Sequence, residues 1–210
     1  MKKVWVAAVV VVVIIVAVIY LIQQKSRQTG SKVPEPVGFS FSTTEIRAAV
    51  DYGKNHRDDL LVDFEKPWTV FLGYGSGKGS ATIFTPYYCL ALMARNWAID
   101  NSNMDTESLC RLCAENHKDL YFEVTLYSAE NNESGFDRDY KAVILQNGRE
   151  IPILKAVHLG YDQAREYTIF SQQKLYFPAD ILREKDKITL RIVKPKEASL
   201  DFVFDLKSIL

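Results

Sequence analysis

Cysteine is scarce in this chain. Its three cysteines, Cys89, Cys110 and Cys113, allow at most one intramolecular disulfide. Small secreted domains that depend on disulfides carry a denser and usually even set. The sequence therefore excludes a disulfide scaffold, and we expect Cys89 to pack in the core as a small apolar residue.

An excess of charge of either sign is also lacking. Lys and Arg number 26, Asp and Glu number 26, and the formal net charge is +0. Proteins that bind nucleic acid usually present a basic stripe or patch. We therefore expect no nucleic-acid partner. The basic residues Lys25, Arg27 and Lys32 are too few for a polybasic lipid-binding segment.

The chain lacks a recognisable catalytic set. Its histidines fall in three unrelated contexts, His56, His117 and His158. Ser76 is not in a G-x-S-x-G motif, because Tyr74 and Lys78 occupy the glycine positions. No motif predicts that Cys89 meets a histidine, as a Cys–His mechanism would require. We assign no catalytic residue, and a hydrolase is the least favoured function.

Glycines cluster in residues 73–79, but not in a phosphate-binding pattern. A Walker A loop would need glycine at Leu72 and a hydroxyl residue at Gly79. The dinucleotide fingerprint G-x-G-x-x-G also fails. We predict instead a glycine-rich hairpin between strands at residues 68–72 and 80–84.

One spacing is typical of metal or redox chemistry, Cys110-x-x-Cys113 with His117 nearby. A structural zinc site needs four ligands, and no second pair is present. A redox pair is expected at a helix N-terminus, whereas these cysteines lie inside or late in a predicted helix. Core packing is the favoured interpretation, and we assign no metal and no cofactor.

The strongest positive signal is the uncharged apolar run of residues 4–22. About 19 residues at 1.5 Å rise form a helix of roughly 28 Å, close to the hydrocarbon thickness of a bilayer. Trp5 and Tyr20 lie near its ends, where aromatic residues favour the interface. We predict a transmembrane signal-anchor at 1–22, with the lipid bilayer as its partner. A cleaved signal peptide and a buried core helix are the alternatives.

The orientation of this anchor is less strongly encoded. Lys2 and Lys3 precede the run, while Lys25, Arg27 and Lys32 follow it, so the positive-inside bias is nearly balanced. The two-lysine start resembles bacterial signal-anchors, which leave the following domain outside the cytoplasm. We therefore expect a single-pass protein of the bacterial cell membrane with an extracytoplasmic domain. Residues 23–38 are polar and contain two prolines, which is typical of a semi-flexible tether.

Residues 39–119 carry helix signals and two short strands. Ser42 and Glu45 form a capping box that opens a helix at 42–55. Thr85 and Pro86 start an apolar helix at 86–99, which we expect to be the most buried helix of the domain. A further helix is predicted at 105–117. His56 follows the first of these helices, in what we expect to be a solvated turn.

Residues 120–210 alternate between apolar and polar positions, which is typical of antiparallel strands. Residues 120–127 place Leu120, Phe122, Val124 and Leu126 on one face. Asn147-Gly148 predicts a type I′ hairpin turn. Further strands are expected at 140–146, 149–157, 167–177, 186–193 and 199–206, and a loop at 158–162.

The expected fold class is α+β: a single transmembrane helix, then a mostly antiparallel β-sandwich with about three helices packed on it. Residues 39–119 and 120–210 are taken as two subregions of one domain. In strand count and in its closing alternating strand, the C-terminal part resembles immunoglobulin-like extracytoplasmic sandwiches. That resemblance concerns the fold and does not carry function.

These observations predict a membrane-anchored, extracytoplasmic and non-enzymatic binding module, with a protein as its partner. The predicted loops at 131–139 and 158–166 are the expected contact regions. The alternative is a small-ligand or lipid-binding domain, with an apolar pocket between the helix at 86–99 and the sheet.

Overall fold

The computed structural model describes residues 42–75, 77–101, 105–116, 120–128, 136–165, 168–178, 181–182, 186–195 and 198–209. The chain divides into two units, Met1–Val37 and Gly38–Leu210, and the described residues all belong to the second. The apolar run at 4–22 and the tether at 23–38 lie outside the described residues. Among the residues described, no helix is both long and apolar enough to cross a membrane.

Five α-helices and one 3₁₀ helix are described in the second unit. They are α2 (Thr43–Asn55), α3 (Leu61–Phe64), η1 (Lys66–Trp68), α4 (Pro86–Ile99), α5 (Thr106–Asn116) and α6 (Leu206–Ile209). The predicted capping box is confirmed, because Ser42 Oγ accepts from the Glu45 amide and the Glu45 carboxylate accepts from the Ser42 amide. At the start of α4, Thr85 Oγ1 accepts from the Tyr88 amide at 3.1 Å. Both helix starts were therefore predictable from local sequence.

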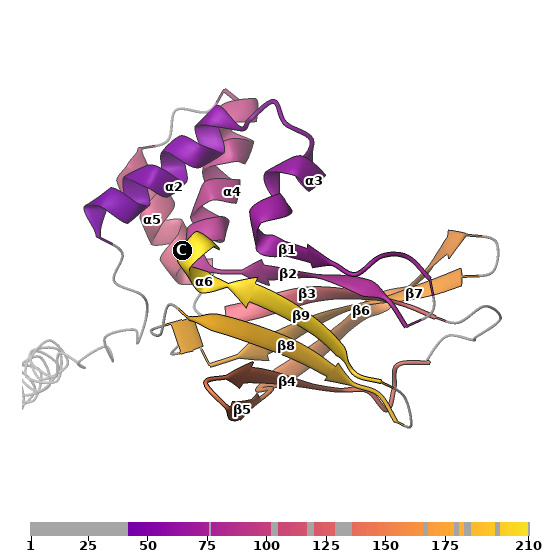
Figure 1. Cartoon of the computed structure of the whole chain (residues 1–210). Coiled ribbons are helices and arrows are strands. Elements are labelled where there is room, and N and C mark those ends of the chain that lie inside the picture. Colours follow the sequence, from indigo (N-terminus) through magenta and orange to yellow (C-terminus); the bar gives the residue numbers. More distant parts are fainter. Residues whose placement is uncertain are drawn as a thin grey trace, which may run out of the picture. The chain divides into compact units, whose positions relative to one another are not determined.

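Among the described residues, nine strands form two antiparallel sheets, whose arrangement is visible in Figure 1. The five-stranded sheet has the order β1 (Thr69–Phe71), β2 (Gly79–Phe84), β3 (Leu120–Tyr127), β7 (Thr168–Phe177) and β6 (Lys155–Arg165). The four-stranded sheet has the order β5 (Arg149–Pro152), β4 (Lys141–Gln146), β8 (Lys187–Val193) and β9 (Leu200–Asp205). The α+β class with two antiparallel sheets is confirmed.

The two sheets pack through their apolar faces. Leu120, Phe122, Val124 and Leu126 of β3 are all buried, as their alternation predicts. The Phe122 ring lies 5.3 Å from the ring of Phe204 on β9, which joins the two layers. The face of the five-stranded sheet that points away from β9 is called the outer face below.

The helices gather over one end of the five-stranded sheet (Figure 1). On its outer face, the ring of Phe84 lies 4.7 Å from Tyr88 of α4 and 4.4 Å from Tyr121 of β3. Tyr88, Leu90 and Ala91 of α4 are buried, as expected for this apolar helix. None of the described helices covers the remaining part of the outer face, toward the β1–β2 hairpin (Figure 1).

Two local predictions are confirmed in the hairpins. Asn147 and Gly148 both have positive φ, 49° and 75°, as a type I′ turn requires between β4 and β5. The glycine-rich residues 73–79 connect the antiparallel strands β1 and β2. The strand predicted at 68–72 begins one residue late, because Trp68 ends the 3₁₀ helix η1 and is buried.

The prediction of a loop at 158–162 is wrong. These residues lie within strand β6, which pairs with β7 along its length. The pairing shifts register between His158 and Gly160, and Gly160 has a φ of 150°. A β-bulge at a glycine accommodates the turn-like composition without ending the strand.

Candidate interaction surface

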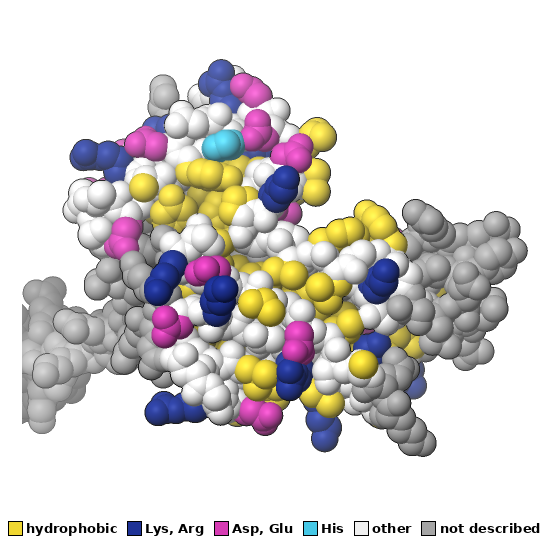
Figure 2. Space-filling model, in the orientation of Figure 1, with side chains coloured by type: hydrophobic (Ala, Val, Ile, Leu, Met, Phe, Trp, Pro, Cys, Tyr) yellow, Lys and Arg dark blue, Asp and Glu magenta, His cyan; other side chains and the backbone are white. Residues whose placement is uncertain are grey.

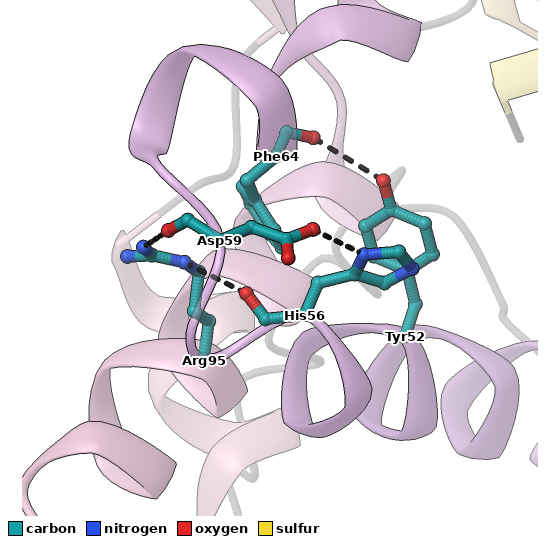
Figure 3. Close-up of polar contacts among 5 residues, drawn as sticks. All are labelled: Tyr52, His56, Asp59, Phe64 and Arg95. Carbon is teal, nitrogen blue, oxygen red and sulfur yellow. Dashed lines mark hydrogen bonds and ion pairs between the residues drawn. The ribbon is translucent and has the colours of Figure 1, made fainter.

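A polar network orders the turn between α2 and α3 (Figure 3). Arg95 of α4, whose side chain is mostly buried, donates from Nε to the His56 carbonyl at 3.3 Å. Its Nη2 donates to the Asp59 carbonyl at 2.5 Å. Backbone carbonyls after the end of a helix lack intrahelical donors, so the guanidinium supplies them. The turn is thus fixed to α4 by a residue far away in sequence.

His56 lies in an exposed turn, as expected, with 41% of its side chain accessible, and it also belongs to this network. Its Nδ1 lies 2.7 Å from Asp59 Oδ2, and its ring stacks on Tyr52 with centroids 4.2 Å apart. The Tyr52 hydroxyl donates to the Phe64 carbonyl at 3.2 Å. Burial, and next the carboxylate of Asp59, raise the pKa of Tyr52. The His56–Asp59 pair resembles half of a catalytic triad, but its described contacts include no nucleophile.

The ordered turn leads into three large aliphatic side chains that face solvent, Leu60 at its end and Leu61 and Val62 at the start of α3. Leu60, Leu61 and Val62 are 71%, 48% and 71% exposed. They precede Phe64, which is completely buried. The Cζ atom of the Arg95 guanidinium lies over the Phe64 ring, 5.3 Å from its centroid. We call Leu60, Leu61 and Val62 the apex. Single exposed apolar residues are ordinary, but three consecutive ones on a fixed turn indicate a contact surface.

A second exposed apolar group lies on the outer face of the five-stranded sheet. Phe71 of β1 and Tyr74 of the hairpin are 51% and 62% exposed. Their ring centroids are 4.8 Å apart, Tyr74 and Tyr127 are 5.5 Å apart, and Tyr127 and Phe170 are 6.2 Å apart. We call these four residues the aromatic ridge. Figure 2 shows hydrophobic side chains on the helical layer and over the β1–β2 region, with the surface hollowed between them.

His158 does not meet a catalytic partner in the described contacts. It lies on β6 with its ring 4.3 Å from that of Tyr161. The Tyr161 hydroxyl donates at 2.7 Å to Asp137, which is 3% exposed. Asp137 also accepts from Ser171 Oγ at 2.5 Å and from the Gln173 amide. These contacts tie the turn before β4 to strands β6 and β7, so the cluster joins the two sheets.

The same hydrogen bonds set the acidity of Asp137. Burial alone would raise the pKa of this carboxyl group, because it disfavours the charge. Donation by Ser171, Tyr161 and Gln173 outweighs burial and lowers the pKa below its ordinary value. Asp137 and Tyr161 lie in the predicted contact loops at 131–139 and 158–166, but the cluster itself was not predicted, since three separate segments supply it.

The cysteines occupy packing positions where they are described. Cys89 is buried in α4, as predicted, and is not in a disulfide. Cys110 of α5 is half-buried, and burial followed by the charge of Glu107 raises the pKa of its thiol. A raised pKa disfavours the thiolate that redox or metal chemistry needs. His117 and the side chain of Cys113 lie outside the described residues.

Two further sequence expectations concern binding. Within the described part of the chain, no group of three or more His, Cys, Asp or Glu side chains is placed to hold a metal ion. Of the predicted contact loops, residues 131–135 lie outside the described residues and residues 158–165 belong to β6. The apex and the aromatic ridge were not predicted as contact surfaces.

Comparison of the chain with protein-family models, with curated proteins and with solved structures finds no match. Function is therefore inferred from surface geometry and side-chain chemistry.

Proposed function

We propose that this chain is a membrane-anchored, extracytoplasmic and non-enzymatic binding module, and that the apex is its contact with a protein partner. The observation that carries the proposal is the exposure of Leu60, Leu61 and Val62 where a turn fixed by Arg95, Tyr52 and the His56–Asp59 pair enters α3. In this proposal residues 4–22 form the single-pass anchor in the bacterial cell membrane, and residues 23–38 form the tether.

Rigidity supports a binding role for the apex. A partner that covers these side chains removes apolar area from water, which is worth about 25 cal/mol per Å². Because hydrogen bonds already order the backbone of the turn, little conformational entropy is lost on binding. Central aliphatic or aromatic anchors on a pre-ordered frame are typical of interaction surfaces.

The alternatives have weaker support. A lipid or small-ligand pocket between α4 and the sheet would occupy the region where Phe84, Tyr88 and Tyr121 stack against one another. For a hydrolase, the described contacts of His56 and His158 supply no nucleophile. Likeness to immunoglobulin domains supports the proposal only at the level of two antiparallel layers. In the immunoglobulin constant domain the second and third strands lie in different sheets, whereas here they are neighbours.

Site-specific photo-crosslinking in intact cells tests this proposal. A photoreactive residue replaces Val62 in the full chain, and the control carries it at Val203, a 51% exposed residue on β9. We expect a discrete adduct with one protein from position 62 and none from position 203. The double variant Leu60→Ser/Leu61→Ser should lose the adduct while keeping its circular dichroism spectrum and melting temperature.

The side of the membrane on which the domain lies is tested in the same cells by protease digestion of a C-terminal tag. Digestion with the inner membrane intact is the expected outcome. Protection until that membrane is opened would contradict the extracytoplasmic assignment. Equal crosslinking from positions 62 and 203, or none from either, would contradict the role of the apex.

A further inference from the structure

The aromatic ridge is an ordered surface that leaves two rings open to water. Phe71 and Tyr74 meet edge-on, with 68° between their ring planes. Tyr127 and Phe170, which are half-buried, continue the row across β3 and β7. The outer face carries Phe71, Tyr127 and Phe170. In each of their strands the side chain alternates with buried or half-buried ones that point toward the other sheet, and the strand register places all three on the same face. The sheet therefore holds the two exposed rings outward.

Among the described residues, a lysine is the charged side chain beside the Phe71 and Tyr74 end of the ridge, while Glu123 on the same face of β3 is paired with Lys174 at 2.9 Å. The sequence contains no Asp or Glu from residue 66 to residue 99, a stretch that includes β1, the hairpin and β2. Lys78 is exposed on this hairpin, and its side chain runs along Gly73, next to Tyr74. Asp162 is the carboxylate at the other end, opposite Phe170 in the β6–β7 register. The end that carries Phe71 and Tyr74 thus combines open aromatic rings with a cation.

We propose that the aromatic ridge is a second membrane contact, seated in the headgroup region of the bilayer that residues 4–22 span. This inference rests on the membrane anchor of the proposed function. Aromatic rings favour the membrane interface, and a lysine beside them can place its ammonium group among anionic headgroups.

The chain outside the described residues permits this contact. The apolar run ends at Ile22 and α2 begins after Ser42. The intervening residues 23–41 can extend to roughly 65 Å, so any face of the domain can reach the bilayer. Because the tether keeps the domain near the lipid, even a weak surface contact is populated.

Tryptophan quenching by lipids brominated in their acyl chains, near the headgroup, tests the contact. The full chain is reconstituted in vesicles of phosphatidylcholine with a minor fraction of phosphatidylglycerol. In a Trp5→Phe background, one variant carries Tyr74→Trp and the matched control carries Val203→Trp. After subtraction of the Trp5→Phe parent, which retains Trp68 and Trp97, the tryptophan at position 74 should lose roughly threefold more fluorescence than the one at position 203, because only the former enters the interface.

A charge reversal gives a second, independent measurement. Lys78→Glu in the Trp5→Phe/Tyr74→Trp chain should weaken quenching in the anionic vesicles and leave it nearly unchanged in pure phosphatidylcholine. The tryptophan emission maximum in detergent should be the same with and without the substitution, which shows that the hairpin is intact.

The possible outcomes distinguish failure of the second membrane contact from failure of the membrane anchor in the proposed function. Comparison of the unaltered chain with the Trp5→Phe chain reports the anchor, because both retain Trp68 and Trp97 and differ only at Trp5. If Trp5 is quenched while position 74 behaves like position 203, the anchor stands and the second membrane contact is overturned; the ridge then faces water or a protein. If Trp5 is not quenched and the chain is washed off the vesicles, the anchor itself fails and the inference fails with it.

Discussion

Asp137 shows at the scale of a single residue how the two sheets are joined. Its carboxylate is buried against donors from β6 and β7, while its own backbone leads into β4 of the other sheet. A buried charge costs free energy unless hydrogen bonds compensate it, and three side-chain donors do so here. The sandwich thus depends on one ionised group at this edge.

This dependence predicts acid sensitivity. The native carboxyl group has a pKa below its ordinary value, so its contribution to stability is complete above the unfolded pKa of about 3.9 and is lost as pH falls through the native pKa. Asp137→Asn should lower the free energy of unfolding by about 2–4 kcal/mol at pH 7 and by much less at acidic pH.

Urea denaturation at pH 7 and near pH 3 measures this difference. Asp63→Asn is the matched control, because Asp63 is exposed. An Asp137→Asn penalty as large in acid as at neutral pH would mean that the ionised carboxylate is not what stabilises the turn.

At the scale of elements, the contact between α2 and α4 depends on one glycine. A methyl group at Gly53 would lie 2.2 Å from the Ala91 carbonyl oxygen, which is a steric overlap with backbone. Glycine in a helix interior is normally unfavourable relative to alanine by roughly 1 kcal/mol. Here the close approach of the two helices outweighs that preference.

Gly53→Ala should therefore lower the free energy of unfolding by about 1–3 kcal/mol, although alanine is the better helix former. Lys54→Ala is the control on the same helix, since Lys54 is exposed. Thermal and urea denaturation of both variants give the comparison. A stabilised Gly53→Ala variant would show that α2 and α4 can separate without cost.

Elements were predictable where the signal is local. The Ser42–Glu45 capping box and the Asn147-Gly148 turn each encode their structure within four residues. The strand at 158–162 was missed because its pairing with β7 and its bulge at Gly160 are tertiary features. Turn-like residues inside a long strand carry no local sign that a partner strand is present.

At the scale of the whole molecule, the last helix completes a core begun by the first elements. The Trp68 Nε1 donates to the Ile209 carbonyl at 3.0 Å, across 141 residues of sequence. Leu206 is fully buried and Ile209 is 5% exposed. Helix α6 thus packs beside η1 and adds two buried side chains to the core there.

Ile209→Ala should lower the free energy of unfolding by about 2–4 kcal/mol, through lost burial and the cavity left behind. Lys207→Ala, on the exposed side of the same helix, should change it by less than about 0.5 kcal/mol. Fluorescence of the tryptophans during urea denaturation follows both variants. Equal stability of the two would mean that α6 only rests on the surface.

The candidate surfaces were beyond local sequence reasoning for the same tertiary cause. The apex depends on Arg95, which lies 36 residues from Asp59 in the sequence. The aromatic ridge gathers Phe71, Tyr127 and Phe170 only through the register of four strands, β1, β2, β3 and β7. The aliphatic and aromatic residues were visible in the sequence, whereas their shared exposure was not.

The long-range closure by α6 also sets the order of events during synthesis. Trp68 leaves the ribosome long before residues 206–209 are synthesised. The second edge of β3 likewise cannot be paired until β7 has been synthesised. Contacts of such large sequence separation slow folding. The Trp68 Nε1 therefore lacks this acceptor on a nascent chain that has not yet been extended through residue 209.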